Sequence, residues 1–343
     1  MPAESRSTAG AVHQQDVAVT NDLPAGWSLR RPTLDDVPAI LAVVHASDVA
    51  AVGEPDFTAE EVVEILQAPH FALERDSWLA LDESGEIVGW AYINNPSGSA
   101  RENIDVYVDP ERGRPARARL LDLVLARIAE RAREAGRTSL TVRAGAIPTE
   151  REYIDLLERS GFTFVKRYAR MRRDLGPDDV PPQAPPGVTV RGVRHGPNGE
   201  IDDAQMRTFH RILDTSFQDT ADYEPTDYTT YRARLVALPG IAWDEWFVAE
   251  VDGEPAGILQ SSFEDGEPNE GWIKNLAVDR RFRGRGVAKL LLRTAFATYR
   301  AKGKTMAGLA VDTANPTGAY RLYESVGMAP LYEADMYERS VSA

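Results

Sequence analysis

The chain has 343 residues, of which 43% are hydrophobic and 27% are charged, and its formal net charge is -14 at pH 7. This length exceeds what one hydrophobic core usually serves, so two domains of about 150 residues each are expected. The acidic balance argues against a nucleic-acid partner, because phosphate contacts require clustered lysines and arginines. The sequence has no cysteine and its five histidines lack metal-ligand spacing, so we expect no metal site.

The N-terminal segment, residues 1–26, has no apolar periodicity and is predicted to be a flexible arm. No apolar run approaches the roughly 18 residues that span a bilayer, and the arm does not pair a basic segment with an apolar one. We therefore expect a cytoplasmic protein, with no membrane partner, that is a monomer or a homodimer.

The first predicted domain covers residues 27–175. Alternating apolar residues predict a hairpin over Trp78–Ile93, and a strand over Val106–Val108 enters a turn that contains glycine. Apolar residues at helical spacing predict a long helix over Ala116–Ala135, and a later short helix ends at Gly161.

A proline-rich, acidic linker, residues 176–187, precedes a second predicted domain, residues 188–343, with the same order of signals. The corresponding elements are a hairpin over Trp246–Ser261, a strand over Leu276–Val278, a helix over Val287–Lys302 and a short helix ending at Gly327. The order of strands and helices predicts an α/β fold in tandem, each copy a mixed, mostly antiparallel sheet flanked by helices.

A glycine-containing loop joins the strand and the long helix of the second half. It consists of Arg283, Gly284, Arg285, Gly286, Val287 and Ala288. A strand that enters such a turn and then a helix directs several backbone N–H groups and the positive end of the helix dipole at one point. The loop therefore predicts a phosphate site, although a simple tight connection without a ligand is the alternative.

Two motifs in this half resemble the GNAT superfamily of N-acetyltransferases. Arg283, Gly286 and Ala288 meet the pattern of the family's acyl-CoA loop, and Asn315 followed by Leu322–Met328 resembles a second family block. The duplication and the linker resemble the tandem GNAT proteins of the actinobacterial, mycothiol-synthase-like type. The resemblance is specific only in the second half.

The resemblance implies a site for acetyl-CoA or another short acyl-CoA. The loop would hold the pyrophosphate, and Leu276, Ala277 and Val278 would bind the pantetheine arm. Tyr323 would protonate the departing thiolate, as suits a phenol with an ordinary pKa of about 10. Asn315 would also bind the arm, although Tyr323 follows it by eight residues where the family commonly has seven.

A general base is harder to identify. The position where many family members carry a glutamate is Trp272 here. Glu270 lies two residues earlier, on the same strand face, and is our first candidate for the base. Glu245 and Asp312 are the alternatives.

The first half lacks the same features. Alignment of residues 112–117 with the loop places Pro115 at Gly286 and Arg117 at Ala288, and Leu157 aligns with Tyr323. A proline removes one N–H group, and a leucine cannot donate a proton. We expect this domain to be non-catalytic and to pack on the other or shape its acceptor cleft.

The acceptor is predicted from charge. Residues 200–270 contain 17 acids against 4 bases, net -13, whereas residues 271–304 contain 10 bases against 1 acid, net +9. The acidic segment supplies aromatic and carboxylate candidates for binding a cationic amine, namely Phe217, Asp219, Trp243 and Glu245. A small polar amine is therefore the expected partner. A non-enzymatic acyl-CoA sensor and a protein N-acetyltransferase are the alternatives.

Overall fold

The computed structural model describes residues 22–68, 71–95, 98–195, 201–218, 223, 225–237, 241–262, 269–315 and 317–343. Most of the predicted N-terminal arm, residues 1–21, lies outside this described part. Within it, no helix combines the length and the apolar character needed to cross a membrane.

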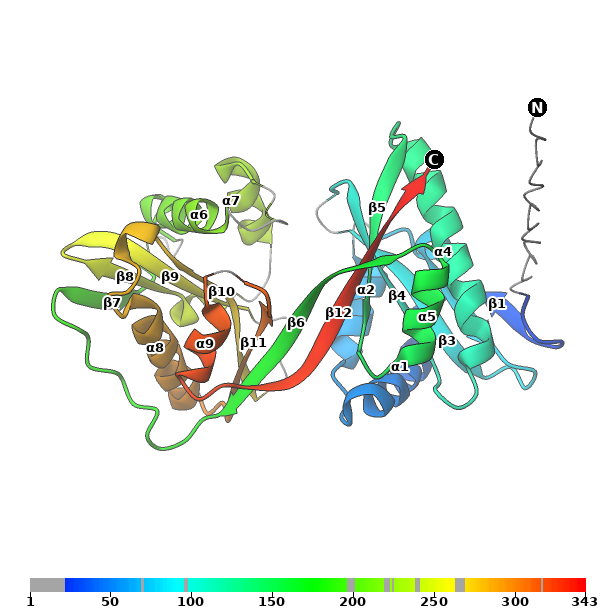
Figure 1. Ribbon diagram of the computed structural model, residues 1–343, viewed down its shortest axis with the longest axis horizontal. Helices are drawn as coiled ribbons and strands as arrows, with labels where there is room; N and C mark the ends of the chain where they lie inside the picture. The colour runs from blue at the N-terminus through cyan, green and yellow to red at the C-terminus, as the bar shows by residue number, and fades with distance from the viewer. Residues whose placement is uncertain are drawn as a thin grey trace, which may run out of the picture.

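The strands form one continuous sheet in the order β1-β2-β3-β4-β5-β12-β6-β11-β10-β9-β8-β7 (Figure 1). In chain order the strands are β1 (Ser28–Arg30), β2 (Ser77–Leu81), β3 (Ile87–Asn94), β4 (Arg101–Val108), β5 (Ser139–Ala146), β6 (Thr163–Asp174), β7 (Val188–Gly192), β8 (Phe247–Val251), β9 (Glu254–Ser262), β10 (Glu270–Val278), β11 (Met306–Asp312) and β12 (Ala329–Ser342). Among the strands of the described residues, only β4 with β5 and β10 with β11 pair in parallel, which confirms the mixed, mostly antiparallel sheet.

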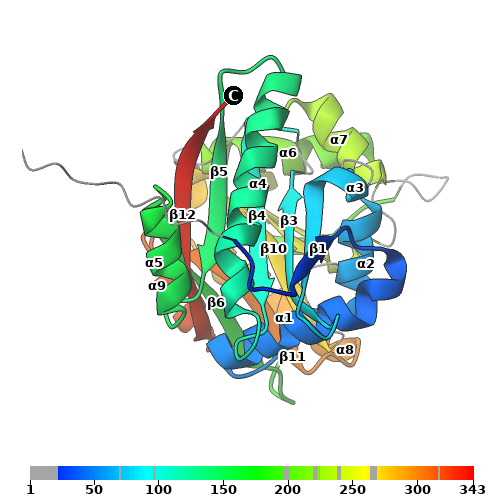
Figure 2. The same ribbon diagram turned by 90° about the vertical axis from the view of Figure 1, so that its right-hand side faces the viewer.

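Helices cover both faces of the sheet in each half. They are α1 (Val37–Val52), α2 (Ala59–Gln67), α3 (Leu73–Asp76), α4 (Arg114–Glu134), α5 (Arg151–Arg159), α6 (Asp203–Phe217), α7 (Tyr228–Ala237), α8 (Val287–Ala301) and α9 (Ala319–Glu324), with 3-10 turns η1 (Leu34–Asp36), η2 (Trp243–Glu245) and η3 (Arg280–Phe282). In the first half, α4 and α5 pack on one face and α1 and α2 on the other (Figure 2). In the second half, α8 and α9 take one face and α6 and α7 the other.

The two halves repeat the same close approach of a helix to the sheet. Gly89 pairs with Val108 in the first half, and Gly257 pairs with Val278 in the second. A Cβ atom added to Gly89 would lie 2.9 Å from a methyl group of α4, and one added to Gly257 would lie 2.8 Å from Val287 of α8. Glycine is therefore needed where each long helix crosses its hairpin, and the predicted duplication has a structural counterpart.

The halves exchange strands at the centre of the sheet. β6 pairs with β11 over Tyr168–Asp174, and β12, the last strand of the chain, pairs with β5. The two exchanged strands also pair with each other and run side by side between the lobes (Figure 1). Tyr337 and Val341 of β12 belong to the core of the first half, and Met171 of β6 belongs to the core of the second. If the chain is divided into two domains at residues 176–187, β6 of the first domain pairs with β11 of the second, and β12 of the second pairs with β5 of the first.

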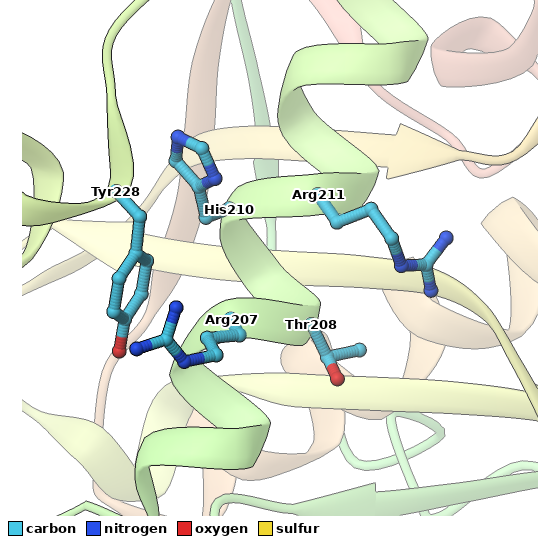
Figure 3. Close-up of a pocket in the computed structure, with 5 residues that line it drawn as sticks. All are labelled: Arg207, Thr208, His210, Arg211 and Tyr228. Atoms are coloured by element: carbon cyan, nitrogen blue, oxygen red, sulfur yellow. The ribbon is translucent and has the colours of Figure 1, made fainter.

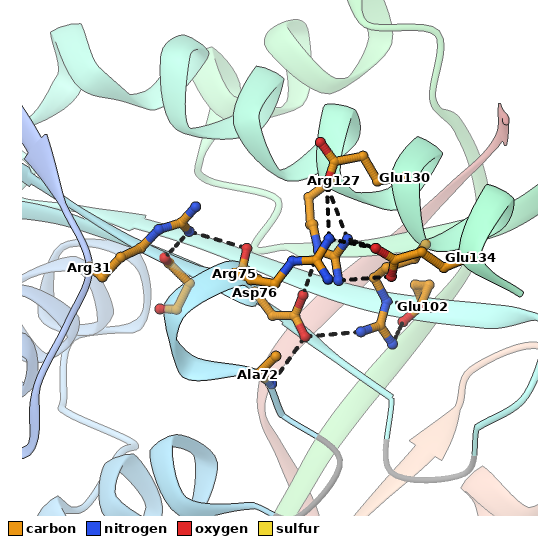
Figure 4. A network of polar contacts seen from close by, with 10 residues as sticks. Arg31, Ala72, Arg75, Asp76, Glu102, Arg127, Glu130 and Glu134 are labelled. Atoms are coloured by element: carbon orange, nitrogen blue, oxygen red, sulfur yellow. Dashed lines mark hydrogen bonds and ion pairs between the residues drawn. The ribbon is translucent and has the colours of Figure 1, made fainter.

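A buried polar network ties α3 and β4 to α4 in the first half (Figure 4). The carboxylate of Asp76, which is 1% exposed, accepts hydrogen bonds from Arg127 at 2.8 Å and from Arg131 at 3.0 Å. Arg131 also pairs with Glu102, and Arg127 pairs with Glu134. Because both arginines share this carboxylate, removal of Asp76 would cost each of them one buried acidic partner and leave Arg127 with Glu134 and Arg131 with Glu102.

Candidate active site

A cleft opens where β10 and β11 separate. The two strands pair only over Glu270–Trp272 and Met306–Gly308, and beyond these residues they diverge. The space between them, which we call the β10/β11 cleft, has a volume of about 690 Å³. A register shift in β10 between Ile273 and Asn275 accompanies the separation. The backbone groups of both strands that face the cleft are thus released from mutual pairing.

The glycine loop forms the outer end of this cleft. Gly284 has φ of 77° and Gly286 has φ of 78°, which is the left-handed region that favours glycine. Gly286 is the N-cap of α8 and has no side chain with which to cap it. The first N–H groups of α8 are therefore available to an anion, as the sequence predicts.

The charge of the β10/β11 cleft also suits an anion. Its lining contains Lys166, Lys274, Arg283 and Lys289, while Asp312 is the one carboxylate among the described lining residues. Arg283 donates to the backbone oxygen of Val278 at 3.3 Å, so its charge is held beside the loop. A ligand with more than one phosphate group could contact basic side chains along the length of this cleft.

Tyr323 lies in the same cleft. Tyr323 lies on α9, and the residue is only 9% exposed. Burial raises the pKa of Tyr323 to about 12, so the phenol stays protonated at neutral pH. A buried, protonated hydroxyl beside the cleft can donate a proton to a leaving group.

Most predicted ligand-binding residues line this cleft. They are Phe217, Leu276, Ala277, Val278, Arg283, Gly284, Gly286, Val287, Ala288 and Asn315. Arg285 does not line it, because its side chain pairs with Asp252 at 3.2 Å. The Asn315 side chain accepts from the backbone N–H of Thr317 at 2.9 Å, and thereby shapes the turn before α9.

Glu270, the first candidate for the base, does not line the β10/β11 cleft. The carboxylate binds both terminal nitrogens of Arg170, at 3.2 and 2.5 Å, and its side chain is 0% exposed. The Arg170 guanidinium in turn stacks 4.1 Å from the Trp272 ring centroid. A Cβ atom at Gly308 would lie only 2.1 Å from the carboxylate. The Glu270 carboxylate is therefore buried and held by Arg170, and its separation from that partner would leave a buried charge unpaired.

Two further candidates, Glu245 and Trp243, also have partners outside the cleft. Glu245 is 2% exposed and pairs with Lys302 at 2.8 Å and Lys304 at 3.2 Å. Trp243 packs against Trp246, with ring centroids 4.7 Å apart. Neither lines the β10/β11 cleft, whereas Asp312 does. Asp219 lies outside the described residues.

The counterpart of the loop in the first half begins with a hydrogen-bonded turn at Asp109. The Asp109 side chain accepts from the N–H groups of Glu111 and Arg112, both at 2.9 Å, and the Asp109 carbonyl accepts from Gly113 at 2.8 Å. A Cβ atom at Gly113 would overlap the carbonyl of Val88, at 2.0 Å. These N–H groups are thus already satisfied within the turn.

A second cleft, which sequence reasoning missed, opens where β4 and β5 separate. The strands pair over Arg101–Ile104 and then diverge, and the β4/β5 cleft has a volume of about 540 Å³. Residues of both halves line it, including Asp105 and Tyr107 from β4, Arg170 from the exchanged strand β6 and Trp272 from β10. Tyr168 and Ala310 line both clefts, so the two adjoin.

A small hollow of about 230 Å³ lies on the outer face of α6 and beside α7 (Figure 3). The Arg207 guanidinium stacks 4.0 Å from the Tyr228 ring centroid, and His210 bonds the backbone oxygen of Thr226 at 2.6 Å. These side chains already interact with one another, and the hollow contains none of the predicted site residues.

Comparisons with known proteins agree with this geometry. Residues 206–328 match the model of the acetyltransferase (GNAT) family. The chain is 28% identical over 275 residues to a mycothiol acetyltransferase of Thermobispora bispora, covering 76% of this chain and 83% of that protein. It is 28% identical over 257 residues to a mycothiol acetyltransferase of Thermomonospora curvata, covering 75% and 80%.

Solved structures share the fold over nearly the whole chain. A GCN5-related N-acetyltransferase of Sphaerobacter thermophilus superposes with a TM-score of 0.79 at 24% identity, covering 94% of this chain and 98% of that one. A tandem GNAT protein from the clavulanic acid biosynthesis pathway superposes with a TM-score of 0.66 at 17% identity, covering 92% and 99%. Residues 206–328 therefore form an acetyltransferase domain of the GNAT family, and the chain as a whole shares the fold of a tandem GNAT protein.

Proposed function

We propose that the protein transfers the acetyl group of acetyl-CoA to a primary amine of a small, cationic molecule, by direct attack in a ternary complex. The observation that carries this proposal is that one cleft combines the glycine loop, a positively charged lining and the buried Tyr323 hydroxyl. The mycothiol acetyltransferases that the chain resembles are also acetyltransferases of a small molecule by name.

The donor fits the cleft from its outer end inwards. The N–H groups at the start of α8 and the cations around them would hold the pyrophosphate. The edge of β10 over Leu276–Val278, released from β11, would hydrogen-bond the pantetheine arm. The thioester would then lie near the point where the strands separate, within reach of Tyr323.

In the reaction the neutral amine attacks the thioester carbonyl, the C–N bond forms and the C–S bond breaks. Tyr323 donates its proton to the departing sulfur. Asp312 would accept the proton that the attacking amine loses. The side chains of Asp312 and Ala310 lie on the same face of β11. Leu309 and Val311 lie on the other face, where they pack with α8 and α9. An acceptor would thus approach from the face opposite to Tyr323.

The first half would be non-catalytic in this scheme. Leu157 takes the place of the tyrosine and is fully buried in the core, and Pro115 removes one N–H group from the first turn of α4. An acyl-CoA sensor would need the loop but not the proton donor. The retention of both in the second half, against the absence of both in the first, favours an enzyme.

The test is release of CoA thiol from acetyl-CoA in the presence of a panel of primary amines, with the product identified by mass. We expect Tyr323→Phe to lower kcat about 100-fold or more while acetyl-CoA affinity stays within about threefold of wild type. Tyr320→Phe, on the same helix but outside the cleft, is the matched control. Equal kcat for Tyr323→Phe and wild type would remove Tyr323 from the mechanism. Acetyl-CoA binding without turnover of any amine would support a sensor.

A further inference from the structure

The β4/β5 cleft is lined by acidic side chains from separate segments of the first half. They are Asp48 on α1, Asp56 before α2, Glu61 in the first turn of α2, Asp105 on β4 and Glu150 before α5. The cation in its described lining, Arg170, is engaged by Glu270 in a bidentate pair. Glu150 pairs with Arg117 at 3.7 Å, so the excess of negative charge in this lining is carried by Asp48, Asp56 and Asp105.

Two of these carboxylates show the electrostatic cost of this arrangement. Burial raises the pKa of Asp48 to about 6. The hydrogen bond from the Asp56 N–H group lowers this pKa, and the negative charge of Asp56 raises it further. Burial also raises the pKa of Asp105, against a hydrogen bond from the Tyr92 hydroxyl. Within the described part of the chain, neither Asp48 nor Asp105 has a basic partner within ion-pair distance. A bound cation would favour the ionised form of both.

A second feature of the cleft is independent of its charge. Tyr153, which is 3% exposed, lines the cleft, and its hydroxyl is buried without a hydrogen-bond partner among the described residues. Such an unsatisfied group costs free energy unless a ligand or water pairs with it. The cleft thus offers one neutral polar group together with its carboxylates.

The rest of the wall is aromatic. The rings that line the cleft are those of Phe57, Tyr107, Tyr153, Tyr168, Trp272 and Tyr332. Aromatic faces attract ammonium and guanidinium groups, and the stacking of Arg170 on Trp272 is one such contact here. A volume of about 540 Å³ lies in the range of clefts that bind whole small molecules.

The same cleft is unsuited to an acyl-CoA. By register, Asp105 and Tyr107 occupy the positions that Asn275 and Ala277 hold in the second half, since Gly89 pairs with Val108 as Gly257 pairs with Val278. A carboxylate and a phenol ring thus replace an amide and a methyl group. The first half has kept the diverging strands but exchanged the lining for one that repels phosphates.

We propose that the β4/β5 cleft binds an organic molecule with two or more ammonium groups, and that this molecule is the acceptor, reaching the β10/β11 cleft past Tyr168 and Ala310. The carboxylates lie on different elements, with Asp48 near the end of α1 and close to Asp56, which follows that helix, and with Asp105 on β4, so they suit charges that are spaced along one molecule. The second part of the inference depends on the proposed function, and the first part does not.

The experiment compares spermidine, which has three amino groups on an aliphatic chain, with butylamine, which has one. Binding is measured by calorimetry on the full chain without acetyl-CoA, and KM and kcat are then measured with acetyl-CoA. The variants are Asp105→Asn on β4 and Asp48→Asn on α1. Because they lie on different elements, either variant can test the site if the other does not fold. Asp155→Asn, an exposed change on α5, is the matched control for net charge.

We expect spermidine to bind wild type at least 10-fold more tightly than butylamine. Each cleft variant should weaken spermidine binding about 10-fold and raise its KM similarly, while kcat and the affinity for acetyl-CoA stay unchanged. Equal binding of the two amines, or equal losses in Asp155→Asn and the cleft variants, would overturn the proposal. Spermidine binding that depends on Asp105 without acetylation would retain the cation site and contradict the acceptor role. Acetylation with an unaltered KM in both cleft variants would retain the transferase and refute the site.

Discussion

Substitution of Gly286 tests the phosphate loop, and its effects can be separated by matched variants. The residue has φ of 78°, so any other side chain costs about 1–2 kcal/mol of backbone strain. An added Cβ would lie 3.4 Å from Pro185, an acceptable contact. Gly286→Gln therefore introduces strain and bulk, and Gly286→Glu adds one negative charge beside the site of the pyrophosphate. Gly284→Ala, with φ of 77° and open space around its Cβ, reports strain alone.

The charge effect can be estimated from Coulomb's law. Two unit charges about 4 Å apart repel by about 4 kcal/mol at an effective dielectric constant of 20. Solvent at the open end of the cleft reduces this to about 2 kcal/mol, or about 30-fold in Kd. Acetyl-CoA affinity should thus be about 30-fold weaker for Gly286→Glu than for Gly286→Gln, measured by calorimetry at low salt, and the ratio should shrink as salt is raised. If Gly286→Glu binds acetyl-CoA as tightly as wild type, the loop does not hold the phosphates.

Further predictions concern the proton acceptor, the pH dependence and the fold. Asp312→Asn should lower kcat about 100-fold at neutral pH with little change in acetyl-CoA affinity, measured by thiol release; an unchanged kcat would exclude Asp312 as the base. Because the pKa of Asp48 is about 6 against an ordinary 3.8, its contribution to stability is present below about pH 4 and is lost as pH rises through 6. Asp48→Asn should therefore be more stable than wild type at pH 7.5 but not at pH 4 in urea unfolding, and equal differences at both pH values would contradict this. Asp76→Asn should lower the free energy of unfolding by about 3 kcal/mol without changing acetyl-CoA affinity. A chain ending at Met328 should lose the cooperative unfolding of the first half, because β12 completes its core.

The parts of the site that were predictable are local in sequence. The loop, its helix and the strand before it form one continuous segment, and the glycines at 284 and 286 adopt the conformation that their identity indicates. The hairpin at Trp246–Ser261 and the long helix from Val287 were likewise expected from spacing. Neighbouring residues determine such features, so pattern alone was sufficient.

The parts that were missed depend on residues far apart in the chain. Glu270 resembled a free carboxylate because its partner, Arg170, is 100 residues away on an exchanged strand. The local sequence pattern of β12 does not show that this strand pairs with β5 as well as with β6. The β4/β5 cleft collects its carboxylates from α1, α2 and β4, so its charge is invisible in a count along the sequence. The acidic segment, residues 200–270, is predicted from such a count. In the structure Trp243 packs against Trp246 and Glu245 pairs with Lys302, so neither lines the β10/β11 cleft.

The most direct test of the central claim is a structure of the protein with CoA bound. The account predicts the pyrophosphate at the N–H groups that begin α8, between Arg283 and Ala288, and the sulfur within hydrogen-bond distance of the Tyr323 hydroxyl. It also predicts that the β4/β5 cleft holds no CoA. A pyrophosphate at residues 112–117, or a sulfur atom placed away from Tyr323, would contradict it.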